Sequence, residues 1–321
     1  MTPWRSEPES EVSMISQNII VGEGTNYPLK GMLTLPDDLS KPVPAVVFVH
    51  GSGSSNMDEK VGKLTPFKDL AEGLAKHGIA SLRYDKRSYV HGFKMKKSAT
   101  ITVKEETIED AVLASNLLKS NPAIDRSKVF IIGHSMGGML APRIDVEGGN
   151  FRGLILMAGT PRKLEEVLLE QTREMLPLSG KLTRFILEKQ IQKLENTFRG
   201  LYDLTDEEAK GKKMGGGTTL YYFKEMGKHP AASYLENLQK PILVLQGGKD
   251  FQVKAEVDFA LYRELLSAHP NASFRLYENL NHCFVPSVFG RIDKAKQEYS
   301  VEQHIGEKVI ADIASWIHSN T

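Results

Sequence analysis

One pentapeptide in the chain has the form of a nucleophile site. Residues 133–137 read GHSMG, and they follow the apolar run VFII at 129–132. A short apolar strand followed by Gly-x-Ser-x-Gly is the sequence form of a nucleophile elbow, in which a tight strand-to-helix turn exposes the serine hydroxyl. Small residues two before and two after the serine are needed, because larger side chains there would collide with the neighbouring strand or helix. The pattern therefore predicts Ser135 as a nucleophile.

A serine nucleophile needs a histidine base, and the base needs an acid that fixes its tautomer. In a parallel sheet such groups lie at the carboxyl ends of the strands. Asp250 follows the apolar run PILVL at 241–245, and His282 follows the run ASFRLY at 272–277. The order serine, acid, histidine is one that known triads use. We therefore expect Ser135, Asp250 and His282 to form a catalytic triad, although Asp250 alone fits an ordinary turn and His282 an ordinary loop.

Other histidines are less suitable as the base. Of six that we compared, one adjoins the nucleophile and should point away from its hydroxyl, two precede the elbow, one lies in a turn and two lie along or at the end of the last helix. We expect structural or surface positions for these residues, which are His134, His50, His91, His269, His304 and His318.

Acyl transfer also needs two backbone N–H groups aimed at the developing oxyanion. Met136 N–H, directly after the nucleophile, is one candidate. The second donor should come from the loop that follows the apolar run AVVFV at 45–49. That loop reads HGSGSS at 50–55, and its Ser52 N–H is the candidate. The alternative is an ordinary glycine-rich turn before a helix.

The elements that must position these groups alternate along the chain. From residue 45 to 158, apolar strand-like runs alternate with helical periodicity, which predicts an α/β fold with a mostly parallel sheet and helices on both faces. Runs at 13–21 and 27–35 predict an antiparallel hairpin at a sheet edge. The basic stretch DKRSYVHGFKMKK at 85–97 predicts a loop, and residues 301–318 predict an amphipathic C-terminal helix.

The alternation stops near residue 161 and resumes later in the chain. The intervening residues show mainly helical periodicity, so we expect a helical cap at 161–237 inserted into a sheet domain made of 13–160 and 238–321. Residues 1–12 predict a loose N-terminal tail. The glycines at 215–217 predict a flexible joint.

Two further groups are candidates for substrate contacts. Arg87 comes just after a predicted strand end, where it could bind a substrate carboxylate; the alternative is a structural ion pair or a solvated side chain. Tyr221, Tyr222 and Phe223 could line an acyl pocket; the alternative is that they form the small core of the cap itself.

The composition narrows the possible partners. Forty-one basic and 40 acidic residues give a formal charge of +1, which does not favour nucleic acid or an anionic membrane as a partner. The single cysteine, Cys283, allows neither an intramolecular disulfide nor a cysteine cluster for zinc. The N-terminal residues are polar and acidic, and no apolar run reaches the length of a membrane span. We expect a cytoplasmic protein without metal or organic cofactor. The sequence does not indicate its oligomeric state.

The motifs resemble those of the α/β-hydrolase-fold serine hydrolases over about residues 20–318, and they read HGSGS at 50–54, GHSMGG at 133–138, GGKD at 247–250 and NH at 281–282. The stretch RYDKRSYVHG at 83–92 and the helical insertion are similar to the bacterial esterase and serine-aminopeptidase-like group. The resemblance implies hydrolysis of a small-molecule carboxylic ester through an acyl-enzyme. The alternatives are a peptidase or acyl-CoA thioesterase with the same triad, or a binding protein that has this fold without catalysis.

Overall fold

The centre of the molecule is one eight-stranded sheet with the strand order β1-β2-β4-β3-β5-β6-β7-β8. The computed structural model describes residues 14–214 and 217–321. The tail predicted at 1–12 and two glycines of the predicted joint lie outside the described residues. The strands are β1 (Met14–Val21), β2 (Leu29–Pro36), β3 (Val43–Val49), β4 (Ala80–Tyr84), β5 (Ile124–His134), β6 (Leu154–Met157), β7 (Ile242–Gly247) and β8 (Ala272–Tyr277).

The strand directions confirm the mostly parallel sheet and the edge hairpin. β1 pairs antiparallel with β2, and β2 pairs antiparallel with β4. All later pairs, from β4–β3 to β7–β8, are parallel. β3 reads VPAVVFV and is almost entirely buried, as expected of a central parallel strand covered on both faces.

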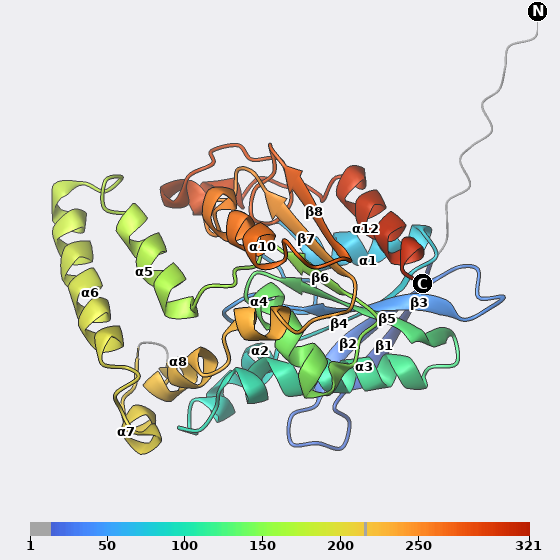
Figure 1. Cartoon of the computed structure of the whole chain (residues 1–321), viewed down its shortest axis with the longest axis horizontal. Coiled ribbons are helices and arrows are strands. Elements are labelled where there is room, and N and C mark those ends of the chain that lie inside the picture. The colour runs from blue at the N-terminus through green and yellow to red at the C-terminus, as the bar shows by residue number, and fades with distance from the viewer. Residues whose placement is uncertain (1–13, 215–216) are drawn as a thin grey trace, which may run out of the picture.

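Helices cover both faces of this sheet (Figure 1). On one face, side chains of α1 (Pro66–Lys76) and α12 (Glu307–Ser319) pack in one apolar cluster with alternate residues of the central strands. On the other face, α3 (Glu109–Ser120), α4 (Met136–Ile144) and α10 (Ala260–Leu265) pack in a second cluster. Short helical segments complete these connections: η1 (Lys104–Ile108), η2 (Asp145–Gly149), η4 (Ala255–Phe259), η5 (Ile292–Lys294) and α11 (Ala295–Glu298).

Two local predictions from the sequence are wrong. The basic stretch predicted as a loop forms helix α2 (Arg87–Met95). Its apolar residues Tyr89, Val90 and Phe93 recur at helical spacing, but Gly92 and the basic residues on either side of this stretch concealed the pattern. The C-terminal helix begins at Glu307 rather than at 301, after Gly306 in an extended conformation.

Between β6 and β7 the chain is helical. This segment contains α5 (Leu164–Glu174), α6 (Lys181–Arg199), α7 (Asp206–Gly211), α8 (Leu220–Gly227) and α9 (Ala231–Leu235). Phe198, Leu201 and Phe223 belong to a small apolar core of their own. In Figure 1, α5 and α6 stand apart from the sheet, at the left of the view. In the two described ranges, no helix combines the length and the apolar character that crossing a bilayer requires.

Candidate active site

Ser135 occupies a strained turn at the carboxyl end of β5. It is the first residue after the strand and the N-cap of α4, with φ of 54° and ψ of −117°. A positive φ is rare for a residue with a side chain and occurs mostly where a functional site requires it. The turn places Ser135 at the N-terminal end of α4, where backbone N–H groups favour negative charge.

Two glycines make this turn sterically possible. A Cβ atom at Gly137 would lie 2.1 Å from the carbonyl oxygen of Val49 on the neighbouring strand. A Cβ atom at Gly133 would lie 2.2 Å from the carbonyl oxygen of Gly137. Neither approach is compatible with a side chain, so the elbow packs directly against β3 and against its own helix.

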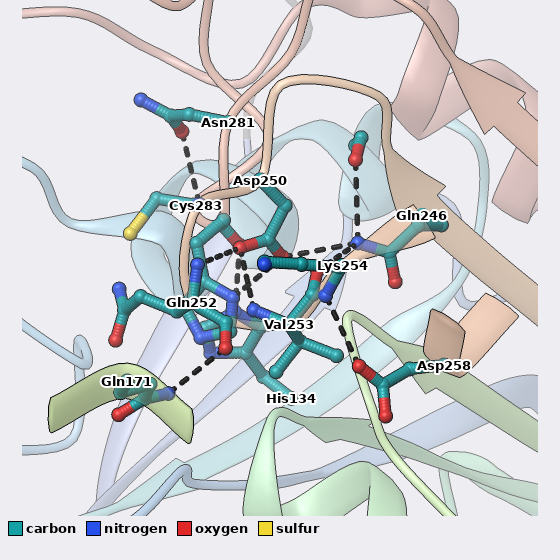
Figure 2. Close-up of polar contacts among 12 residues, drawn as sticks. His134, Gln171, Gln246, Asp250, Gln252, Val253, Lys254, Asp258, Asn281 and Cys283 are labelled. Atoms are coloured by element: carbon teal, nitrogen blue, oxygen red, sulfur yellow. Dashed lines mark hydrogen bonds and ion pairs between the residues drawn. The ribbon is translucent and has the colours of Figure 1, made fainter. Parts of the chain in front are cut away.

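Asp250 and His282 are joined by a short, buried contact. Asp250 follows β7, His282 follows β8, and His282 Nδ1 lies 2.7 Å from Asp250 Oδ2. The Gln246 amide donates to the same carboxylate oxygen at 3.0 Å, and the backbone N–H groups of Gln252 and Val253 donate to the other at 2.8 and 3.0 Å (Figure 2). These donors stabilise the Asp250 anion, which in turn favours the tautomer of His282 that carries its proton on Nδ1.

Ser135 lies beside this pair. The ring of its chain neighbour His134 packs against the His282 ring at an angle of 49°, with a centroid distance of 4.7 Å, and His134 Nε2 lies 2.9 Å from the His282 carbonyl oxygen. Among the described residues no hydrogen bond joins Ser135 Oγ to His282. Catalytic hydrogen bonds are often long without substrate and shorten in the reacting complex.

The two candidate oxyanion donors lie on the two segments next to Ser135. Gly51 packs against the elbow so closely that a Cβ atom at this position would lie 3.1 Å from Ser135 Cβ. Ser52 follows it, and Met136 is the first residue of α4. Within residues 14–214 and 217–321, neither the Ser52 nor the Met136 N–H donates to a protein acceptor, so both groups are available to a ligand oxygen.

A cavity of about 730 Å³ opens beside these donors and includes Ser52 and Met136 in its wall. Much of the remaining wall is apolar and comes from α2, α5 and α8; its residues include Val90, Phe93, Met95, Leu164, Leu168 and Phe223. Phe93 is 78% exposed at its edge. Such a cavity suits an apolar group attached to the carbonyl that Ser135 would attack.

The four candidate substrate contacts separate into two pairs. Tyr222 and Phe223 line the cavity, although Phe223 also packs in the small helical core. Arg87 is buried and donates to both carboxylate oxygens of Asp110, as well as to Glu109. Arg87 therefore forms a structural ion pair, which was the alternative to binding a substrate carboxylate. Tyr221 packs against the small helical core and is not part of the cavity wall.

A buried charged network surrounds the site, and the sequence reasoning did not identify it. Glu59, in the loop after β3, has φ of 50°, and its carboxylate lies 2.9 Å from His134 Nδ1. Burial disfavours the charged form of His134, but the Glu59 carboxylate outweighs this effect and raises the pKa of His134. Lys86, just after β4, is also buried. Its position two residues after the end of β4 was the signal in the sequence that it could lie near the site.

Cys283 is poorly suited to act as a nucleophile. It adjoins His282 but is buried, and burial raises the pKa of its thiol well above the usual value. A protonated thiol is a poor nucleophile.

The buried His50 should make stability depend on pH. Burial lowers the pKa of His50 from 6.5 to about 4. Between these pH values His50 is therefore protonated in the unfolded chain but neutral in the folded protein. Stability should therefore fall as the pH drops from 6.5 towards 4, by about 2–3 kcal/mol from this residue. Urea unfolding at pH 7 and pH 4.5 measures this, and His50→Gln should lose less stability than wild type.

The exposed His318 provides the control for this prediction, because His318→Gln should show the full wild-type loss. An equal loss of stability in wild type and His50→Gln between the two pH values would contradict the prediction.

The fold and the site together define the class of the protein. A mostly parallel sheet with an edge hairpin, a serine elbow after β5, and an acid and a histidine after β7 and β8 are the features of the α/β-hydrolase fold. Residues 40–285 match the family described as serine aminopeptidase, S33. The chain belongs to this family.

Relatives of known structure or activity agree with this placement. The chain is 35% identical over 289 residues to esterase EstD of Thermotoga maritima, an alignment that covers 90% of this chain and 65% of EstD. The chain thus spans just under two thirds of that relative. The esterase Pf2001 of Pyrococcus furiosus matches with a TM-score of 0.58 at 15% identity, over 99% of this chain and 95% of its own. A puromycin-hydrolysing peptidase of Mycobacterium tuberculosis matches with a TM-score of 0.59 at 14% identity, over 95% of this chain and 39% of the peptidase chain.

Proposed function

We propose that the chain is a serine carboxylesterase that cleaves small-molecule carboxylic esters through an acyl-enzyme. The observation that carries the proposal is the buried 2.7 Å contact between Asp250 and His282 at the sheet edge that also carries the strained Ser135. The likeness to EstD, which is named an esterase, supports the same activity.

The proposed reaction begins with attack by Ser135 Oγ on the ester carbonyl carbon, while the serine proton moves to His282 Nε2. The carbonyl π electrons move onto oxygen, and the N–H groups of Ser52 and Met136 stabilise this oxyanion. When the intermediate collapses, the bond to the alcohol oxygen breaks and the alcohol takes the proton from His282. Asp250 stabilises the imidazolium that forms between these two transfers.

Deacylation repeats the same steps with water. Water gives a proton to His282 as its oxygen attacks the acyl carbonyl, and Ser135 Oγ leaves with that proton. The carboxylic acid is released and the free enzyme is restored. In this proposal the chemistry needs no metal or organic cofactor.

We further propose that the segment 161–237 acts as a cap that selects the substrate. Leu164 and Leu168 of α5 and Phe223 of α8 form part of the cavity wall, which supports binding of an apolar acyl or alcohol group under these helices. In this proposal Tyr222 and Phe223 contact substrate, whereas Arg87 and Tyr221 support the surrounding structure. The cytoplasmic location expected from the sequence stays a prediction.

Peptide hydrolysis by the same groups is the second candidate, because the family is described as a serine aminopeptidase family. An aminopeptidase requires an acidic group that binds the free amino terminus of its substrate. Among the described residues of the cavity wall the acidic one is Glu106. Its carboxylate accepts a hydrogen bond from Tyr222 at 2.6 Å and lies 3.6 Å from the Lys86 ammonium group, so both of its oxygens already have partners within the protein. This arrangement favours the ester.

A substrate panel tests the proposal. We expect kcat/KM for p-nitrophenyl esters of varied acyl length to exceed that for aminoacyl p-nitroanilides and acyl-CoA thioesters, with a preference for acyl chains that fill the apolar cavity. Ser135→Ala measured on the same panel corrects for background hydrolysis. A higher kcat/KM for the anilides or the thioesters would reject the carboxylesterase assignment in favour of that activity.

A further inference from the structure

Two buried charged side chains outside the triad hold the two peptides that meet at Gly51, and the second of these peptides carries the proposed oxyanion donor. The backbone N–H of Gly51 donates to Glu59 Oε1 at 2.7 Å, and the Gly51 carbonyl oxygen accepts from Lys86 Nζ at 2.8 Å. Glu59 is 4% exposed and Lys86 is 2% exposed. Lys86 also holds the far end of this loop, because its backbone N–H donates to the Ser55 carbonyl oxygen.

The contact to Lys86 fixes the direction of one particular N–H group. The Gly51 carbonyl and the Ser52 N–H belong to the same peptide unit, which is planar and trans, so the two groups point in opposite directions. An ammonium group bound to the carbonyl therefore aims the Ser52 N–H away from Lys86. Ser52 lines the cavity together with Met136, and Gly51 packs on Ser135, so the free side of this peptide faces the reacting region.

The charge of Lys86 has a second effect on the same peptide. A hydrogen bond from an ionised donor is stronger than a neutral one, and it polarises the amide to which it binds. A polarised amide has a more positive N–H, which makes Ser52 a better donor to an oxyanion. The effect increases with burial, because the local dielectric is low.

Stability alone does not explain a lysine at this position. Removing an ammonium group from water costs several kcal/mol, and well-packed apolar residues often replace buried ion pairs without loss of stability. The partner carboxylate, Glu106, is 3.6 Å from Lys86 Nζ, farther than the 2.8 Å to the Gly51 carbonyl. Of these two contacts of the Lys86 ammonium group, the shorter is therefore the one to the backbone of the oxyanion loop.

We propose that Lys86 is a positioning residue that orients and polarises the Gly51–Ser52 peptide, so that the Ser52 N–H stabilises the oxyanion. The inference rests on the proposed function. The contacts of Lys86 also reach the cavity wall, because Glu106 lies between Lys86 and Tyr222 of α8. On the other side of Gly51, Glu59 holds the preceding peptide and contacts His134, which in turn contacts the carbonyl of His282.

The test replaces Lys86 by methionine, which keeps most of the volume and removes the charge. We expect Lys86→Met to lower kcat for a p-nitrophenyl ester by about 10- to 100-fold with KM changed less than twofold, because the lost interaction acts on the transition state. A trifluoromethyl ketone provides a second readout. Ser135 Oγ adds to its carbonyl carbon, the serine proton moves to His282, and the carbonyl oxygen becomes an oxyanion. Its Ki should rise by the same factor by which kcat/KM falls.

Lys119→Met is the matched control, because Lys119 Nζ also donates to backbone carbonyl oxygens, those of Gly149 and Asn150, away from the site. It should leave kcat and Ki unchanged. Lys86→Gln, which is smaller and keeps a neutral donor, provides a second variant if methionine impairs folding, and it should show a smaller loss of the same kind.

Some outcomes would overturn the inference. A folded Lys86 variant with kcat within twofold of wild type would do so, as would a fall in kcat with an unchanged Ki for the ketone. Failure of the proposed function gives a different result: wild type itself would hydrolyse no ester and its Ser135 would not react with the ketone.

Discussion

Replacing Ser135 by alanine is expected to lower kcat for p-nitrophenyl esters by about 10⁵-fold, since the variant has no nucleophile and the members of a triad act as one unit. The protein should stay folded, because alanine removes only the hydroxyl; the backbone strain at φ of 54° is tolerated in wild type by a residue that also has a Cβ atom. Kinetics on the purified variant measure the loss. A fluorophosphonate probe, which bonds covalently to activated serines, should label wild type and leave Ser135→Ala unlabelled.

Ser115→Ala is the matched control for this prediction. Ser115 is a buried serine of α3 whose hydroxyl donates to the Gly149 carbonyl oxygen of η2, and it is not part of the cavity wall. The control should keep full activity and labelling. Probe attachment to a residue other than Ser135, or near-normal activity in Ser135→Ala, would show that the nucleophile has been assigned wrongly.

Replacing Asp250 by asparagine should produce the second large loss, about 10⁴-fold in kcat at neutral pH. The asparagine oxygen can still accept from the N–H groups of Gln252 and Val253. The Gln246 amide loses its acceptor on residue 250 but keeps the Val253 carbonyl oxygen, so the loop should keep its shape. The NH₂ group would then face His282 Nδ1, where it donates instead of accepting. His282 would adopt the wrong tautomer, with its proton on Nε2, and could not take the proton of Ser135.

This variant is compared with Asp258→Asn. Asp258 is also buried and pairs with Arg162 and Thr160, outside the site. Its replacement should lower the thermal unfolding temperature while kcat changes little. Asp250→Asn should show the reverse, a large fall in kcat with little change in unfolding temperature. If both variants lose only stability, Asp250 is a structural residue and the triad assignment fails.

Much of the fold could be predicted because its signals are local. Apolar runs of five or six residues mark strands such as β3 and β7, and their alternation with helical periodicity specifies a mostly parallel sheet. The position of a polar residue just after such a run then places it at the carboxyl edge. This reasoning brought Asp250 and His282 to one place, and the structure has them 2.7 Å apart.

Helix α2 shows where local patterns are insufficient. Its stretch is strongly basic and contains Gly92, which is typical of a loop. The helix nevertheless forms, because the carboxylates of Asp110 and Glu109 at the start of α3 hold Arg87 at its start, and because Phe93 and Val90 form part of the cavity wall. These stabilising contacts come from tertiary structure, which overrides local propensity.

The sequence by itself determined the fold class and the serine turn, and it placed the candidate acid and base just after strands, since each of these signals is a short local run of residues. Only the tertiary structure decided what surrounds them. Glu59 meets His134 and Lys86 meets Gly51 through contacts between distant segments, and no periodicity encodes such pairs. The size and apolar character of the cavity were likewise decided by packing, because its wall combines α2, α5 and α8. Buried charges find their partners only when the sheet brings its strand ends together.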